Sequence, residues 1–465
     1  MLKKSLALSY LTFLLAGYSN AQEEVDEAPP IKLLRAEESY LYLQEEEKSQ
    51  IFLQPLKLIE LNASKGIFLT VGGEYRARFE SFTNEGYSSE NDSYYSQRLD
   101  LHASLNLGTR VRLFGELYHG LTSGEDRLLE DDKIDLHQGF LEVVLLNKAS
   151  SSMSLRLGRQ EIGYGASRLI GIREGPNMRR SFDLAKLAYQ KGQGSLNIIY
   201  GKELTYGFDA FDNESNLFEN DSQNPTIWGM YLQDNFVGKP GKLDFYYFGF
   251  NSATARFNDV VGEETRHSIG VRSYGKVGRY SFNTEVIYQF GELGRSDISA
   301  YNFETDWKYI VIDKGWKPTL GLRLDFSSGD ATPGDGKIQT FNPMFVNPAI
   351  YSLAAVNTPS NLIGFHPNLT VYPAEGFSIY MDYALFFRTR VNDGLYTPPR
   401  FIRREANNID EKHIGDVIGL QANWEINRNV SFDLRSSYFI AGKFIEATGD
   451  AENTFYIAPT ISFKF

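Results

Sequence analysis

Arginine is the side chain whose spacing in this 465-residue sequence most suggests chemistry. Two short stretches concentrate it: Arg156, Arg159, Arg168, Arg173, Arg179 and Arg180 against Glu161 and Glu174, and Arg388, Arg390, Arg400, Arg403 and Arg404 against Asp393 and Glu405. A guanidinium offers a fixed fork of N–H donors that matches the two oxygens of a carboxylate, and it stays charged at physiological pH. Such stretches suit a series of binding sites for a polyanion that passes in single file.

Other reactive groups show no site pattern. The six histidines lack metal-ligand spacing, and neither GxSxG nor a phosphate-binding glycine loop is present. No Ser–His pair suits a lipase. Five acidic residues could bind calcium, but their spacing does not match an EF-hand loop, and a solvated loop is favoured: Asp209, Asp212, Glu214, Glu219 and Asp221. We therefore expect no catalytic residue, no metal and no cofactor.

Composition leaves two classes of protein. There is no cysteine, so disulfides are excluded, and the net charge of -12 argues against a nucleic-acid partner. A mean hydropathy of -0.33, with no apolar run near the roughly 20 residues that a membrane helix needs beyond the N-terminus, argues against a helical membrane protein. A large soluble β protein and an outer-membrane β-barrel remain, because barrel strands alternate polar and apolar residues.

The N-terminus predicts export. Lys3 and Lys4, the apolar run 6–15 and small residues at 19 and 21 are typical of a cleaved signal peptide over residues 1–21. Residues 22–60 are expected to form an acidic periplasmic segment. Its first part, 22–50, holds nine acids against three bases, a charge of about -6. A free tail is one interpretation, and a plug that mimics the polyanion across the mouth of a pore is the other.

Period-two alternation from residue 67 onward predicts strands, most clearly at 377–387 and 454–465. Tight turns and long connections alternate along the chain. The long connections are expected at 82–94, 121–132, 165–181, 204–226, 252–266, 293–299, 327–361, 390–413 and 445–454. With eight tight turns they predict an all-β fold over residues 61–465: one transmembrane antiparallel β-barrel of about 18 strands, with short periplasmic turns and long extracellular loops. The apolar terminal residue Phe465 is typical of substrates of the barrel assembly machinery.

Residues that alternate with the apolar, lipid-facing ones would point into the lumen, and many of them are arginines. The inward arginines are expected to be Arg76, Arg78, Arg98, Arg110, Arg112, Arg156, Arg323, Arg388, Arg390 and Arg435. Arg or Lys facing lipid at mid-depth would cost about 2–4 kcal/mol, which favours this assignment. Arg159 has the lipid-facing parity, so it requires a bulge near Gly158 or a position above the membrane.

These arginines also have a structural interpretation. Inward guanidinium groups could pair with neighbouring carboxylates and brace a wide barrel, while arginines in loops could bind lipopolysaccharide phosphates. Both interpretations stay open at this point.

Several motifs resemble the alginate export family of outer-membrane porins. They are the stretch from Leu155 to Gly165 (LRLGRQEIGYG), then RLIG at 168–171, RSFD at 180–183, TFNPMF at 340–345, NLI with HP at 361–367, and FR at 387–388 with DG at 393–394. The resemblance runs in order from about Gly73 to Phe465. It implies an eighteen-stranded monomeric barrel with an arginine-rich constriction that passes an anionic polyuronate.

The resemblance also implies roles for particular residues. Constriction or loop-anchoring roles fall on Arg156, Arg159, Gln160, Arg168, Arg180 and Asp183, and Arg388 is expected as a lumen arginine opposite them. The chain departs from the family at Arg173–Asn177, where many members have an acidic residue followed by an aromatic one.

Together these features predict a passive channel, not an enzyme, in the cell outer membrane. It would pass an anionic polysaccharide or oligouronate, in either direction, through an arginine-rich lumen. The alternative is a general diffusion porin that prefers anions or sugars. Expected partners are outer-membrane lipid, lipopolysaccharide and the barrel assembly machinery.

Overall fold

The computed structural model describes residues 29–44, 51–124, 126–215, 224–234, 241–352, 357–397 and 401–465. The predicted signal peptide lies outside these residues. The strands of the barrel are β2 (Ile67–Thr83), β3 (Asp92–Leu107), β4 (Val111–Thr122), β5 (Asp132–Lys148), β6 (Ser151–Gln160), β7 (Phe182–Lys191), β8 (Gly194–Glu203), β9 (Thr226–Asp234), β10 (Gly241–Phe257), β11 (Val260–Val277), β12 (Tyr280–Leu293), β13 (Ser296–Ile310), β14 (Thr319–Ser327), β16 (Leu362–Ala374), β17 (Phe377–Arg388), β20 (His413–Glu425), β21 (Val430–Ala441) and β22 (Thr454–Lys464).

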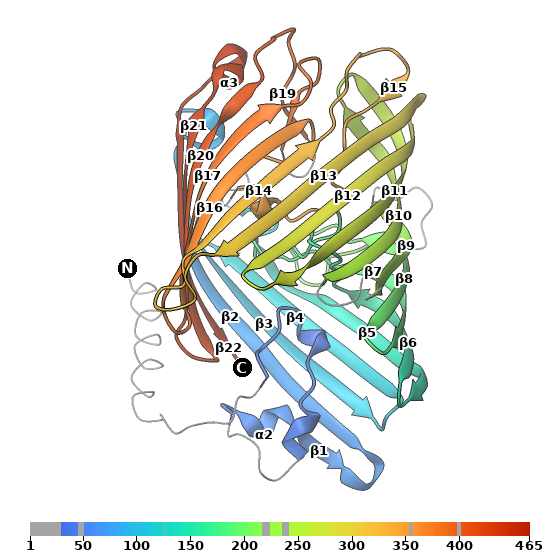
Figure 1. The fold of residues 1–465 in the computed structure, drawn as a ribbon. Coiled ribbons are helices and arrows are strands. Elements are labelled where there is room, and N and C mark those ends of the chain that lie inside the picture. Colours follow the sequence, from blue (N-terminus) through green and yellow to red (C-terminus); the bar gives the residue numbers. More distant parts are fainter. Residues whose placement is uncertain are drawn as a thin grey trace.

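The sheet closes on itself, which confirms the predicted barrel (Figure 1). It contains twenty strands, and two of them, β1 (Ile59–Asn62) and β15 (Lys337–Ile338), are short additions, which leaves eighteen in the wall. Successive wall strands pair antiparallel, and β2 pairs with β22 in a register that sets Glu74 opposite Lys464. Closure satisfies the edge hydrogen bonds that an open sheet would leave exposed.

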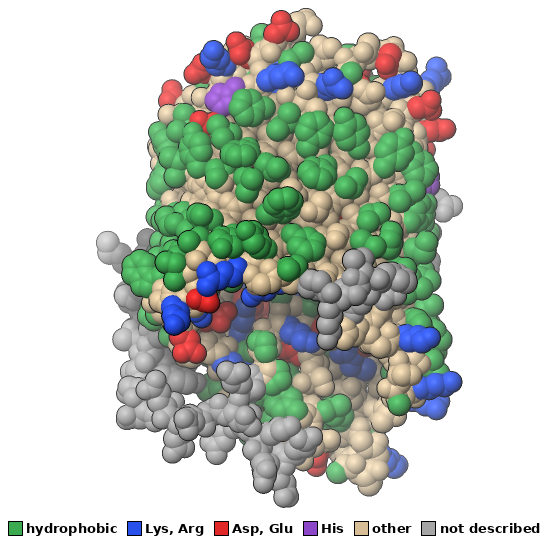
Figure 2. All heavy atoms as spheres, viewed as in Figure 1, with side chains coloured by type: hydrophobic (Ala, Val, Ile, Leu, Met, Phe, Trp, Pro, Cys, Tyr) green, Lys and Arg blue, Asp and Glu red, His purple; other side chains and the backbone are tan. Residues whose placement is uncertain are grey.

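The wall is polar inside and apolar outside. Along β3, Arg98 is 0% and Asp100 2% exposed, while Leu99 is 40% and Leu101 45% exposed. Figure 2 shows hydrophobic side chains covering the outer wall between charged upper and lower ends. This pattern is the inverse of a soluble protein and matches a barrel whose outer surface meets lipid, as the parity predicts.

Two predicted long loops are wrong. Residues 252–266 and 293–299 were expected as polar connections, but β10 and β11 are joined by a two-residue turn at Asn258–Asp259, and β12 and β13 by one at Gly294–Arg295. The strands continue through these polar stretches because strand pairing needs only backbone groups. Positive φ angles at Asn258 (50°) and Gly294 (58°) close the turns.

Helical structure is sparse. The described elements are α2 (Gln54–Lys57), α3 (Lys443–Thr448) and several 3₁₀ turns, including Arg35–Glu37 and Leu41–Gln44. None of the helices in the described part of the chain is long and apolar enough to cross a membrane. The remaining strands, β18 (Leu395–Thr397) and β19 (Phe401–Arg404), form a separate hairpin.

Two long loops fold together against the inner wall. Ile170, in the loop between β6 and β7, bridges to Phe345, in the loop between β14 and β16. Gly171 N donates to Phe345 O at 2.9 Å, and Phe345 N donates to Leu169 O at 2.9 Å. Their apolar residues share one buried cluster with inward side chains of the wall, such as Phe248. These loops therefore narrow the lumen from within.

The C-terminal residue completes the closure. Phe465 N donates to Gly73 O at 3.0 Å, and Gly73 N donates to Phe465 O at 3.1 Å. Deleting Phe465 should sharply lower the yield of barrel that migrates differently in gels when heated and unheated, because β22 loses its terminal pairing with β2. Phe455→Ala, on the same strand at a lipid-exposed position, is the matched control. Equal yields of the two variants would contradict this role.

Candidate functional site: a charged lumen

The lower lumen contains a cluster of cations on neighbouring strands. Arg112 of β4, Arg156 of β6 and Lys186 of β7 meet there, because Glu142 of β5 pairs in register with both Arg112 and Arg156, and Arg156 pairs with Lys186. Glu142 forms ion pairs with both arginines. One wall carboxylate thus serves three cations, and the cluster retains an excess of positive charge.

A carboxylate from the N-terminal segment meets this excess. Glu37 Oε1 lies 2.9 Å from Arg156 Nη1. Burial opposes ionisation of Glu37, but the charges of Arg156, Lys186 and Arg112 and the hydrogen bond from Arg156 outweigh it and lower the pKa of its carboxyl to about 2. The side chain is still 42% exposed because it borders two cavities inside the barrel.

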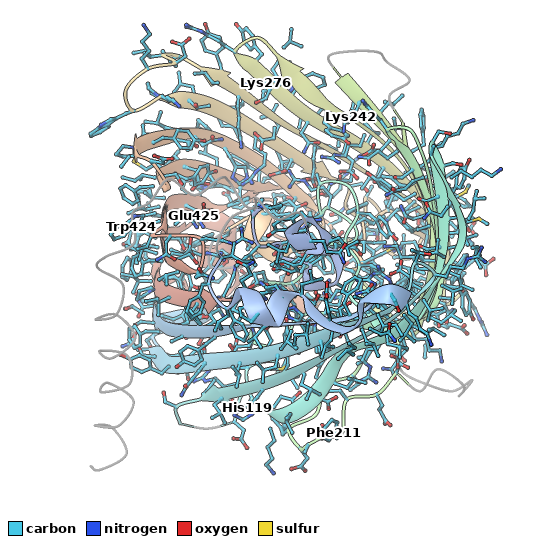
Figure 3. All side chains as sticks on the ribbon, turned by 90° about the horizontal axis from the view of Figure 1, so that it is seen from below. His119, Phe211, Lys242, Lys276, Trp424 and Glu425 are labelled. Carbon is cyan, nitrogen blue, oxygen red and sulfur yellow. The ribbon has the colours of Figure 1, made fainter. Side chains whose placement is uncertain are left out.

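The segment around Glu37 lies across the lower opening, as the view from below shows (Figure 3). Arg112 donates to Ala36 O at 2.7 Å, and Arg179 donates to Leu33 O at 3.3 Å. Ala36 packs in a buried cluster with Phe114 and Phe140. Of the nine acids in the predicted acidic stretch 22–50, the structure describes Glu37 and Glu38, and the other seven lie outside the described residues.

Above the lower opening of the barrel, Glu174 is a counter-ion that three arginines share. It lies in the inward loop between β6 and β7, 2.9 Å from Arg98, 2.9 Å from Arg179 and 3.5 Å from Arg76. Burial opposes its charge, but these three guanidinium groups hold the pKa of its carboxyl well below the usual value. Arg76 and Arg78 also donate to the backbone carbonyls of Glu174 and Gly175. The stretch Arg173–Asn177 therefore anchors the loop to the wall.

A second network joins the same loop to the opposite wall. Arg168 lies 2.5 Å from Glu304 of β13 and 3.8 Å from Asp325 of β14. Asp325 Oδ2 also lies 3.0 Å from His366 Nε2 and 3.6 Å from Arg323 Nε. The structure thus brings Arg168 and Arg323 together through a shared carboxylate, as bracing pairs would.

Arg159 and Asp183 pair with each other on the outer side of the wall. Arg159 Nε donates to Asp183 Oδ1 at 3.0 Å, and its guanidinium also donates to Asn213 O at 3.0 Å. Strands β5 and β6 stay in register at Gly158, so the proposed bulge there is wrong. The loop that covers Arg159 lies outside the wall, where Figure 3 labels its residue Phe211.

The side chains of Gln160 and Arg180 form hydrogen bonds and an ion pair with other groups of the protein. The Gln160 amide donates to Gly158 O and Leu184 O at 3.2 and 3.1 Å. Arg180 pairs with Glu203 at 2.8 Å and donates to Phe345 O. Both hold the base of the inward loops.

Arg388, at the end of β17, lies among the backbone groups of the loop that follows this strand. It is fully buried and donates to the backbone carbonyls of Val391, Asp393, Ile409 and Glu411, while its guanidinium lies 3.7 Å from the centre of the Phe444 ring. It therefore ties the loop after β17 together. Arg390 has an exposed side chain in that loop, and half-buried Arg435 pairs with Asp433 at 2.8 Å.

Among the residues that the structure describes, two groups could hold a cation, although histidine spacing in the sequence gave no such signal. They are Asp100, His102 and Glu116, and Glu116, His137 and Glu161. In the second group, Arg179 already pairs with Glu161 at 2.7 Å. In the first, one acceptor atom of each residue has no protein partner, but Arg98 lies 3.9 Å from Asp100 and opposes a divalent cation. The sequence signal that could have indicated the first group is that Asp100, His102 and Glu116 all have inward parity on two strands that pair, β3 and β4.

Known structures share the barrel fold. The chain is similar in structure to Pseudomonas aeruginosa OpdO (TM-score 0.57, 11% identity, 85% of this chain and 97% of that chain covered) and to Acinetobacter baumannii OccAB1 (TM-score 0.55, 12% identity, 85% and 97%). A search of curated proteins finds no match. The fold and the charged lumen define an outer-membrane channel of the porin type.

The family follows from the sequence model. The model described as "Alginate export" matches residues 68–458, so the chain belongs to the alginate export family. This confirms the resemblance that the motifs indicated.

The shared counter-ion is open to test. Glu174→Gln should lower the free energy of unfolding by about 3 kcal/mol, the low end for breaking a buried ion pair, because its side chain is 28% exposed. Denaturant unfolding of the folded barrel measures the change. Glu405→Gln, which breaks an exposed pair with Arg256, is the control and should cost about 0–1 kcal/mol. Equal costs would show that Glu174 does not compensate the buried arginines.

Proposed function

We propose that this barrel is a passive channel for an anionic polysaccharide or oligouronate, and that the cluster of Arg112, Arg156 and Lys186 binds the carboxylates of the substrate. The observation that carries the proposal is Glu37, a carboxylate that Arg156 binds at 2.9 Å inside the lumen. A site that orients one carboxylate offers the same donors to the carboxylate of a uronic acid.

The cavities beside Glu37 support a sugar ligand. One, of about 300 Å³, is lined by Lys186 and Arg272, by polar side chains such as Asn197 and Gln233, and by aromatic residues. Tyr164 and Tyr231 stack there with ring centroids 5.2 Å apart. Cations, amide groups and aromatic faces together suit the carboxylate, hydroxyl groups and apolar face of a uronate.

Several arginines of the lumen do not belong to this proposed substrate site. Arg76, Arg78, Arg98, Arg168, Arg180 and Arg323 have close partners in the wall or the inward loops and serve as braces. Among the solved barrels of this fold, P. aeruginosa OccK2 (OpdF) is described in complex with glucuronate. The family and the fold favour a channel over an enzyme. We further propose lipopolysaccharide at the exposed loop arginines, such as Arg390, and the barrel assembly machinery at Phe465 as partners.

Anion preference and block by oligouronates test the proposal. Arg112→Gln with Arg156→Gln should lower the anion preference measured from reversal potentials, and should weaken block by an oligouronate at least about tenfold, since each charge-assisted hydrogen bond contributes about 1.5–3 kcal/mol. Arg279→Gln removes an exposed arginine that pairs with Asp313 in the turns outside the lumen, and should leave both unchanged.

Glu142→Gln provides a test of opposite sign. It frees both arginines from their wall counter-ion and should strengthen the block. A general diffusion porin would show no saturable block, with oligouronates no more effective than neutral oligosaccharides of equal length. That result would favour the second candidate function.

A further inference from the structure

The N-terminal segment and the expected substrate share one binding site. Residues 29–44 pair with no strand of the barrel, and their described elements are two 3₁₀ turns. Yet Arg35 donates to Phe465 O at 2.6 Å, Arg112 to Ala36 O at 2.7 Å and Arg156 to Glu37 at 2.9 Å. Two of these three contacts come from lumen cations, Arg112 and Arg156, that the channel would otherwise offer to an anion, and the third comes from the segment's own Arg35.

We propose that Glu37 stands in for a substrate carboxylate, so that residues 29–44 close the lumen until a uronate chain displaces them from Arg112, Arg156 and Lys186. The inference rests on the proposed function for its substrate class. It adds a regulatory role for the segment, in which binding of the substrate displaces the segment and opens the channel.

Displacement is chemically balanced because one carboxylate replaces another. Arg156 exchanges Glu37 for a uronate oxygen, so no guanidinium loses its counter-charge during the exchange. Apolar anchoring by the described segment rests on two buried side chains. Ala36 packs with the stacked rings of Phe114 and Phe140, and Tyr40 is buried with Lys57 Nζ 5.0 Å from its ring centre. The cavities of about 260 Å³ and 300 Å³ that border Glu37 give a sugar chain room on both sides of the residue it replaces.

The segment cannot leave the mouth entirely. Beyond it, Lys57 Nζ donates to Val71 O at 2.9 Å, and β1 pairs with β2. A tether of this kind gives an effective concentration on the order of mM, so a single uronate would compete poorly. A chain that also engages Arg272 and Lys186 in the adjoining cavity would compete well. The device thus favours oligomers over monosaccharides.

Glu37→Gln is the decisive variant, and Glu60→Gln is its matched control. Glu60 has the same side chain and lies exposed in β1, in register with Phe68, whereas Arg112 and Arg156 belong to β4 and β6. Channel conductance in KCl alone, in planar bilayers, reports closure without any substrate. We expect Glu37→Gln to raise the open probability several-fold at low salt, and Glu60→Gln to match the unaltered protein. Near 1 M salt, where the Debye length is about 3 Å, the variants should converge.

Substrate competition is measured on the same channels. The concentration of an oligouronate that half-blocks the current should fall about tenfold in Glu37→Gln, since the site no longer holds a competing carboxylate. Deleting residues 29–44 should have the same effect on conductance and block, and migration of unheated samples verifies that both variants are folded.

The outcomes separate the two claims. Unaltered conductance and block in both Glu37→Gln and the deletion would overturn the plug, even if the block still depends on Arg112 and Arg156. Raised conductance at low salt without oligouronate block in any variant would support the plug and reject the proposed substrate class.

Discussion

Each guanidinium that the barrel turns inward must find a negative charge or a carbonyl, because a buried cation without a partner is strongly destabilising. This constraint organises the interior. The wall supplies some partners, as Glu80 does for Arg78 at 2.8 Å. The inward loops supply others, as Glu174 does for Arg98. At the lower mouth, wall carboxylates fall short, and a separate segment of the chain provides Glu37.

The source of the counter-charge separates braces from a binding site. Where both partners lie on the wall or on a loop packed in the core, exchange with a ligand would leave a buried charge unpaired, and the pair is structural. Arg168 with Glu304 is such a case, since both side chains are almost fully buried. Where the partner belongs to a segment without strand pairing, exchange costs little. The cluster of Arg112, Arg156 and Lys186 meets that condition, and it borders the two cavities beside Glu37.

Much of the fold could be predicted from the sequence, because turn residues and alternation report directly on strand number and on the face each residue occupies. The eighteen strands and the inward parity of Arg98 and Arg156 followed from these signals. The ion pairs of these arginines could not be predicted, because alternation shows which face of the sheet a residue occupies but not which residue it contacts. Arg98, for example, pairs with Glu174, 76 residues away, in a loop whose path no local sequence pattern encodes. The partners of Arg388 could not be predicted for the same reason, since they are loop carbonyls.

The stretch Arg173–Asn177 links the inward loop to the wall. Its acidic residue, Glu174, pairs with arginines of β2 and β3, and its backbone carbonyls accept hydrogen bonds from Arg76 and Arg78. A relative with different residues there would need other counter-ions for the same wall arginines. Loop shape and lumen charge are thus coupled in this chain.

A structure of the detergent-solubilised protein with an oligouronate bound would test the central claim most directly, that the lower cluster is a carboxylate site. The account predicts a uronate carboxylate within hydrogen-bond distance of Arg156, at the position that Glu37 occupies without ligand, with the N-terminal segment displaced from Arg112. An oligouronate bound elsewhere in the lumen, with Glu37 still paired to Arg156, would contradict it.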